Sequence, residues 1–212
     1  MLSQRTIKNK ITCSGVGLHT GKKVKLTFHP AEPNTGILFR RIDGDKVVDI
    51  PATAKNVGET TLSTTLVYGD YKISTIEHLL SALAGTGVDN CIIDCDGPEI
   101  PIMDGSSTQF VFLIQTAGIV EQNAVKKFVY VTKSVQVQRD DAVARIKPYD
   151  GFRVTFTLEF DHPVYNKYPH SASIDFSQTS FIREVSRART FGLMDDLEKL
   201  KKMNLALGAN LN

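Results

Sequence analysis

Strand and helix patterns follow each other in the same order twice along this chain, which limits the possible folds more than any single motif. The first set has alternating strands, an apolar helix at 74–85, another strand and a helix at 108–118. After a polar stretch at 121–127, strand, turn and strand recur before a helix within 180–191. Separate runs of strands and helices are typical of α+β folds. The order predicts two similar domains of β-sheet plus helices, packed together.

The expected domains cover residues 1–122 and 126–212, and the 212 residues are enough for two small cores. The second set ends in the segment 196–212 without the strand and closing helix that the first set has after Gly87. We therefore expect the second domain to be incomplete. An open sheet edge and an uncovered apolar face promote association, so poor solubility or self-association is predicted.

Alternation of apolar and polar residues predicts the individual strands. The clearest is KKVKLTFHP at 22–30, and the turn after it leads into ILFRRI at 37–42 as a hairpin or through a longer connection. Further strands are predicted within VDNCIIDCDG at 88–97 and at 128–138. The segment 144–160 has the pattern of strand, proline, turn glycine and strand.

Composition excludes several classes of protein. The formal net charge is only +2, the basic residues are scattered and there is no tryptophan, so a nucleic-acid surface is not indicated. The three cysteines are an odd number without CxxC spacing and follow no secretory leader, which predicts a reducing compartment. Cys91 and Cys95 are expected to pack in a strand. No run of eighteen apolar residues could span a membrane.

The stretch STIEHLLSALAG at 74–85 places Glu77 and His78 in the first turn of an otherwise apolar helix. In a structural interpretation, Ser74 and Glu77 form a capping box and His78 is a half-buried polar residue. In a functional one, the histidine holds a metal ion and the carboxylate before it reaches the metal-bound water. The HExxH motif is absent because no second histidine follows at the required spacing. Spacing alone favours the structural interpretation.

Five further segments carry a family resemblance when they are taken together. They are GVGLHTG at 15–21, ISTIEHLLSALAGTGVDN at 73–90, PEIPIMDGSS at 98–107, KKFVYV at 126–131 and SRARTFGLMDD at 186–196. With these segments the chain resembles the UDP-3-O-acyl-N-acetylglucosamine deacetylases, the zinc amidases that commit the lipid A pathway. The likeness covers essentially all of the chain.

The resemblance implies a role for each matching position. His78 is implied to be one of three zinc ligands, and Glu77 the general base, because zinc lowers the pKa of bound water towards about 7. The Thr190 hydroxyl is implied to stabilise the oxyanion; without the resemblance it is an ordinary helix-end hydroxyl. The other two ligands and a general-acid histidine belong to later motifs of the family that these 212 residues lack. We therefore expect little zinc binding and an inactive fragment.

The implied substrate is UDP-3-O-(3-hydroxyacyl)-N-acetylglucosamine. Leu18 and Ser63 match positions near the mouth of the active site, and Glu159 and Phe160 match a pair that packs on the uridine. An apolar passage for the acyl chain is implied after the TFG motif, although core residues would look the same. The residues concerned are Phe191, Leu193, Leu197, Leu200, Leu207 and Leu211.

The resemblance further implies a cytoplasmic protein of Gram-negative bacteria, at most peripheral to the inner membrane, without a nucleic-acid partner and monomeric when complete. The alternative is a non-catalytic module that binds a nucleotide sugar or RNA, since small duplicated α+β units also occur in RNA-binding proteins. A regulatory form that binds the UDP-sugar without cleaving it is a third interpretation. Alanine at Glu77 and His78 in the complete protein separates the first two, because an enzyme loses its activity with the fold intact, and measuring UDP binding by the 212-residue chain tests the third.

Overall fold

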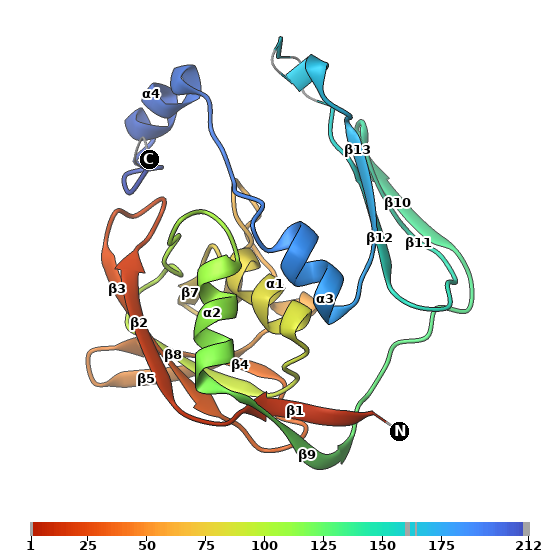
Figure 1. Ribbon diagram of the computed structural model, residues 1–212. Helices are drawn as coiled ribbons and strands as arrows, with labels where there is room; N and C mark the ends of the chain where they lie inside the picture. The colour runs from red at the N-terminus through yellow and green to blue at the C-terminus, as the bar shows by residue number, and fades with distance from the viewer. Residues whose placement is uncertain (1, 160–161, 164, 210–212) are drawn as a thin grey trace.

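The computed structural model describes residues 2–159, 162–163 and 165–209 (Figure 1). A five-stranded sheet forms the base of the first half, in the order β2–β3–β8–β4–β5. Its neighbours pair antiparallel, except that β4 and β8 are parallel. The strands are β2 (Ile11–Val16), β3 (Lys23–Pro30), β4 (Ile37–Asp43), β5 (Lys46–Pro51) and β8 (Cys91–Cys95).

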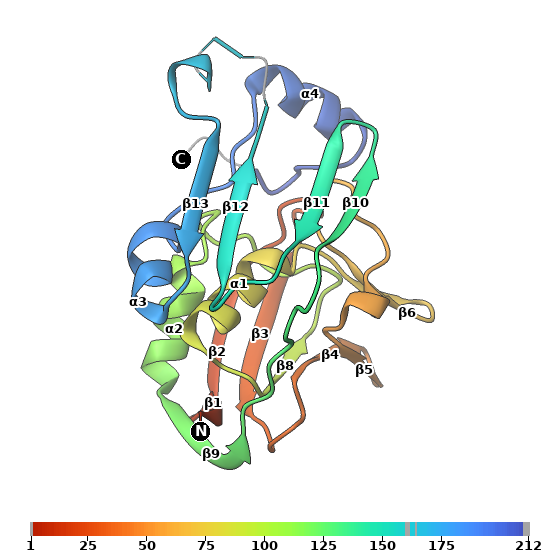
Figure 2. The same cartoon turned by 90° about the vertical axis from the view of Figure 1, so that its right-hand side faces the viewer.

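Helices α1 (Glu77–Thr86) and α2 (Thr108–Ala117) pack on one face of this sheet and close the core (Figures 1 and 2). Their apolar faces bury side chains against alternate residues of the strands, as period-two and period-3.6 patterns require. The core includes Leu26, Phe28, Phe39, Ile93, Leu79, Leu83, Phe110 and Ile114. Gly87 ends α1 with a positive φ of 77°, as a C-terminal glycine commonly does. Within the described residues, no helix is long and apolar enough to span a bilayer.

Three smaller elements complete the first half. Strand β1 (Ser3–Ile7) pairs antiparallel with β9 (Ile119–Val125), and β6 (Leu66–Tyr68) forms a ribbon with β7 (Tyr71–Ile73). A single 3₁₀ turn, η1 (Ala54–Asn56), lies between β5 and β6. The β1–β9 pair joins the two ends of the first half, because Ser3 lies opposite Val125.

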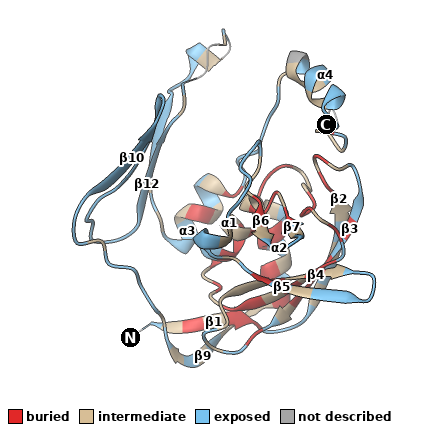
Figure 3. Cartoon of the chain, turned by 180° about the vertical axis from the view of Figure 1, so that it is seen from behind, coloured by how far each residue is buried: buried red, intermediate tan, exposed pale blue. Residues whose placement is uncertain are grey.

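The second half consists of two ribbons, which stand to one side of the first half, and of short helical segments (Figure 1). Strand β10 (Val135–Arg139) pairs with β11 (Ala142–Ile146), and β12 (Arg153–Thr157) pairs with β13 (Ser171–Asp175). Every residue of β10, β11 and β12 is exposed (Figure 3). The helical segments are η2 (Tyr165–Lys167), α3 (Gln178–Ser180), the π-helix η3 (Phe181–Val185) and α4 (Met194–Lys202).

The α+β class is confirmed, and the strands predicted at 22–30, 37–42 and 88–97 and the helix at 108–118 are present. Strand β8 lies between β3 and β4, so these two are joined by a longer connection and not by a hairpin. The division at residues 122 and 126 stays a prediction.

Two predicted elements are shorter than expected. The strand at 128–138 begins only at Val135, and the residues before it are mostly exposed and have no pairing strand among the described residues. The helix within 180–191 ends at Val185, where the chain leaves the helical path and runs on to pair with Gly105. The local pattern is therefore not sufficient at either place: the first segment lacks a pairing strand among the described residues, and the second makes a long-range contact.

Cys91 and Cys95 lie in β8, and both are buried free thiols. The prediction that they pack in a strand is confirmed. Burial raises the pKa of Cys91 to about 12 and that of Cys95 to about 11. Both side chains therefore stay protonated at neutral pH and act as small apolar core residues.

Candidate active site

Glu77 and His78 form the first turn of α1, and both are half-buried. The helix begins at Glu77, and the N-cap residue Ile76 makes no side-chain capping hydrogen bond. The capping box expected from Ser74 is therefore wrong. Thr75 explains the difference, because its φ of 58° breaks the helical path. The Ser74 hydroxyl donates instead to the carbonyl oxygen of Pro98, at 3.3 Å.

The carboxylate of Glu77 is held by the loop that precedes β6, here termed the 62–65 loop. The Thr64 backbone N–H donates to Glu77 Oε2 at 3.0 Å, and the Ile76 N–H donates to the Thr64 carbonyl at 3.3 Å. Glu77 Oε1 has no hydrogen-bond partner among the residues that the structure describes. One carboxylate oxygen is thus fixed by a neighbouring loop, while the other is open to a water or substrate group.

The Gly17–Thr20 loop lies beside the 62–65 loop, with His19 Nε2 3.4 Å from the Leu62 carbonyl oxygen. The carboxylate of Glu99 fixes the backbone of the Gly17–Thr20 loop, because it accepts hydrogen bonds from the N–H groups of His19 and Thr20, both at 2.8 Å. A Cβ at Gly17 would collide with the Glu99 carboxylate. Glycine at that position is therefore a requirement of close packing.

Hydrogen bonds to the turn at 102–105 hold Thr190 at the cavity wall. Its backbone N–H donates to the carbonyl oxygen of Gly105 at 2.8 Å, and Arg189 Nε donates to that of Asp104 at 2.6 Å. Gly105 has a φ of 83°, and a Cβ added there would lie 3.4 Å from Thr190 Cγ2. The DG turn of the PIMDGSS motif therefore sets the position of Thr190.

A cavity of about 870 Å³ opens beside these loops. Four parts of the chain contribute to its wall: the Gly17–Thr20 loop, the 62–65 loop, the 102–105 turn and the segment 189–209. The wall closes where the Gly208 N–H donates to the Leu18 carbonyl at 2.9 Å and the Leu207 N–H to the His19 carbonyl at 3.3 Å. Most of the lining is apolar, with His19, Asp104, Arg189 and Thr190 as the polar side chains.

The structure brings many of the sequence-predicted residues to this cavity. Leu62 and Thr64 flank Ser63, which is half-buried, and Leu62 lines the cavity. Leu207 lies between two lining residues, Ala206 and Gly208. The predicted residues that line the cavity are Leu18, Thr190, Phe191, Leu193, Leu197 and Leu200.

Other predicted residues lie elsewhere. Glu77 and His78 are not among the lining residues, and Glu77 is joined to the cavity wall through its hydrogen bond with the 62–65 loop. Glu159 follows β12, is exposed and does not line the cavity. Phe160 and Leu211 lie outside the described residues.

The donor set fits a metal ion only in part. His78 offers one imidazole beside a carboxylate, which is suitable ligand chemistry for zinc. In the part of the chain that the structure describes, however, no three His, Cys, Asp or Glu side chains come together to hold a metal ion. These residues by themselves therefore do not form a zinc site.

Sequence reasoning missed Glu99. It is fully buried, and its role depends on backbone donors that lie 79 and 80 residues away in the chain. A signal was present, because a carboxylate in the stretch PEIPIM at 98–103 has to find hydrogen-bond donors or a cation if it is buried.

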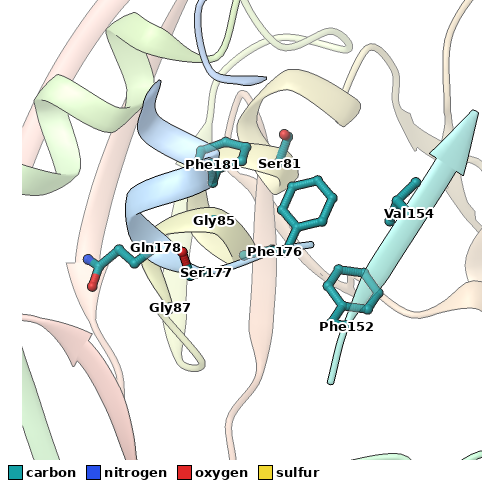
Figure 4. Close-up of a pocket in the computed structure, with 10 residues that line it drawn as sticks. Ser81, Gly85, Gly87, Phe152, Val154, Phe176, Ser177, Gln178 and Phe181 are labelled. Carbon is teal, nitrogen blue, oxygen red and sulfur yellow. The ribbon is translucent and has the colours of Figure 1, made fainter. Parts of the chain in front are cut away.

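A second hollow, of about 370 Å³, lies between α1 and β12 (Figure 4). Its wall is mainly apolar and includes the rings of Phe152, Phe176 and Phe181. Among the described residues, the polar side chains that line it are Ser81, Ser177 and Gln178, and none of these is an acid or a base near neutral pH.

Comparisons with known proteins identify the family of the chain. The family model of UDP-3-O-acyl N-acetylglycosamine deacetylase matches residues 4–212. The chain is 58% identical over all 212 residues to the UDP-3-O-acyl-N-acetylglucosamine deacetylase of Methylococcus capsulatus, and 55% identical to that of Coxiella burnetii. It covers 70% of the length of each of these relatives. The chain therefore belongs to the UDP-3-O-acyl-N-acetylglucosamine deacetylase family.

Proposed function

We propose that this chain carries the general base and the acyl-binding cavity of a hydrolase that removes the acetyl group from UDP-3-O-acyl-N-acetylglucosamine in lipid A biosynthesis. The observation that carries the proposal is the position of Glu77. Its carboxylate, beside His78 in sequence, is bound by the Thr64 N–H of a neighbouring loop whose Leu62 lines a large apolar cavity. Family membership favours this function over an RNA-binding module.

Each residue has a role that follows from its surroundings. Glu77 takes the proton from the water that attacks the acetyl carbonyl, since one of its oxygens is fixed and the other is open. The hydroxyl of Thr190, at the cavity wall, donates to the oxyanion that this attack creates. The acyl chain occupies the cavity beside Phe191, Leu193 and Leu197.

The family resemblance also implies zinc at His78. Zinc would supply a Lewis acid and a more acidic water. A zinc site needs three or four converging donors, and the described residues bring together no such group. We therefore expect the 212-residue chain to bind zinc weakly and to have little deacetylase activity alone.

Binding without cleavage is the second candidate function, because the cavity forms within the described residues whereas the metal donors do not. Both functions fit a protein of the Gram-negative cytoplasm. There the buried cysteines stay reduced, and the substrate's nucleotide is available.

Calorimetric titration of the 212-residue chain tests the proposal. UDP-3-O-acyl-N-acetylglucosamine is expected to bind more than tenfold tighter than UDP-N-acetylglucosamine, because several CH₂ groups enter the cavity. Leu197→Asp should remove that difference, while Glu198→Gln on the exposed side of α4 should leave it unchanged. Equal affinity for the two compounds would contradict the assignment of the cavity.

A parallel titration with zinc chloride and an acetate-release assay tests the catalytic expectation. Weak zinc binding and negligible turnover are expected from this chain. Tight binding of one zinc ion with turnover would show that the chain completes a metal site by itself. In that case Glu77→Gln should abolish the turnover and leave affinity for the acyl compound unchanged.

A further inference from the structure

We propose that Glu99 is a positioning residue: its buried carboxylate locks the Gly17–Thr20 loop to the start of α1 and so fixes His19 relative to Glu77 and His78. The inference rests on the proposed role of that pair. Nothing in the proposed reaction requires Glu99 to touch the substrate, and it is not among the residues that line the cavity.

The hydrogen bonds of Glu99 are its first argument. The side chain is fully buried, and no ion pair to it occurs among the described residues. Its Oε1 accepts from the His19 N–H at 2.8 Å and from the Thr75 hydroxyl at 3.0 Å, and its Oε2 accepts from the Thr20 N–H at 2.8 Å. Because a buried charge needs strong donors, Glu99 holds both donor segments in one arrangement.

The backbone of Thr75 is the second argument. Its φ of 58° lies in the left-handed region, which is a genuine outlier for a β-branched residue. Such a conformation persists only where its surroundings impose it. The hydroxyl of Thr75 is bound by Glu99, while Ser74 on its N-terminal side pairs with Pro98 and Ile100 through backbone hydrogen bonds. Glu99 thus restrains the residue two places before Glu77.

The contacts close into a ring. From Thr75 the chain enters α1, where Glu77 and Ile76 bind the backbone of Thr64. The 62–65 loop in turn meets His19 through the Leu62 carbonyl, and the His19 backbone returns to Glu99. Loss of the Glu99 carboxylate removes the contacts that join the Gly17–Thr20 loop to Thr75 at the start of α1. The surroundings of both His19 and His78 should therefore change.

Nuclear magnetic resonance on the ¹⁵N-labelled 212-residue chain tests the inference without a metal and without activity. The signals to follow are the ring resonances of His19 and His78 and the backbone N–H of Thr64. Glu99→Ala should shift all three. Glu99→Gln keeps one acceptor oxygen but turns an NH₂ group towards a donor, so it should give a smaller change in the same direction.

A matched control comes from Asn90, which is 1% exposed and makes three side-chain hydrogen bonds, to Gly36, Gln4 and Gln122. Asn90→Ala should lower stability and leave the three site signals unchanged. If it shifts them as Glu99→Ala does, or if Glu99→Ala moves only the His19 signal, Glu99 merely supports its own loop and the inference is overturned.

Variants at Thr75 keep the inference testable if Glu99→Ala does not fold. Thr75→Ser retains the hydroxyl and should reproduce the parent spectrum, whereas Thr75→Val should shift the Thr64 and His78 signals. Identical spectra for the two variants would overturn the inference.

Failure of the proposed function can be recognised separately. In that case the parent chain does not bind UDP-3-O-acyl-N-acetylglucosamine, although the histidine signals can still respond to Glu99→Ala. If the parent chain does bind the compound, Glu99→Gln should weaken binding on the order of tenfold, since a hydrogen bond between a charged and a neutral group is lost. Unchanged affinity in a variant with shifted histidine signals would refute the positioning role.

Discussion

Gly85 lies within α1, on the side that faces the Phe181 ring. Glycine inside a helix costs about 0.5–1 kcal/mol relative to alanine, so a packing reason is needed. A Cβ at this position would overlap the ring of Phe181, which is itself 2% exposed in the core. The missing side chain thus lets the second half of the chain dock on α1.

Gly85→Ala should therefore lower the free energy of unfolding by about 1–3 kcal/mol, as overpacking in a core does. Urea denaturation measures the change. Gly192→Ala is the matched control, because nothing lies within 4 Å of the Cβ position there. If Gly85→Ala were stabilising, helix propensity would outweigh the contact with Phe181.

Individual site residues differ in how far the sequence could predict them. The sequence motifs single out Leu18, Thr190 and Leu193, and all three line one cavity. The environment of Glu77 was not predictable, because the N–H that binds it belongs to Thr64, in a loop without a regular pattern. Local spacing reports neighbours within a turn or a strand, whereas this contact depends on how two loops meet.

Asp175 on the β12–β13 ribbon is an exposed carboxylate whose pKa is lowered by its neighbours. Asp175 lies opposite Arg153 and accepts from its guanidinium at 2.7–3.1 Å, and the Tyr149 hydroxyl donates to it at 2.6 Å. These hydrogen bonds, first that of Arg153 and then that of Tyr149, hold the pKa of Asp175 below its usual value of 3.8. The contribution to the ribbon is present above pH 3.8 and is lost as the pH falls through the lowered pKa.

A carboxyl titration of Asp175 by NMR should accordingly have its midpoint below pH 3.8. Arg153→Gln should raise the midpoint because the charged donor is gone, and Tyr149→Phe should raise it less. An Asp175 midpoint at the model-peptide value in the parent chain would show that the pair does not persist in solution.

Elements with strong periodicity were predicted well, because one face of each packs on the core. This holds for β3, β8 and α2. The position of β8 between β3 and β4 was not predictable, since pairing between strands distant in sequence leaves no local pattern. The helix expected within 180–191 ends at Val185, and farther along the Thr190 N–H donates to the carbonyl of Gly105, 85 residues away, which no local pattern reports.

The two halves of the molecule differ in how well their side chains are buried. The first half has a continuous core, while the ribbons of the second half are coloured as exposed over most of their length (Figure 3), and their exposed residues include large apolar ones. Such surfaces and unpaired strand edges promote association. The exposed residues include Val135, Val137, Val143, Ile146, Phe152 and Phe156.

The 212-residue chain should therefore associate with increasing concentration, which analytical ultracentrifugation measures. Val137→Lys combined with Phe156→Lys should reduce the association. Phe112→Lys is the control, because Phe112 is 67% exposed on α2 while Phe156 is 64% exposed on its ribbon. A parent chain that stays monomeric at every concentration would contradict the prediction.

The hydrogen bonds from residues 207 and 208 to Leu18 and His19 join opposite ends of the sequence. Closing so long a loop is entropically unfavourable, and contacts of this kind tend to form slowly. During synthesis or refolding, the five-stranded sheet and helices α1 and α2 can assemble from the first half of the chain well before these two hydrogen bonds form. The cavity is therefore a late product of folding, and an unfinished chain acquires its core before it has a place to receive a ligand.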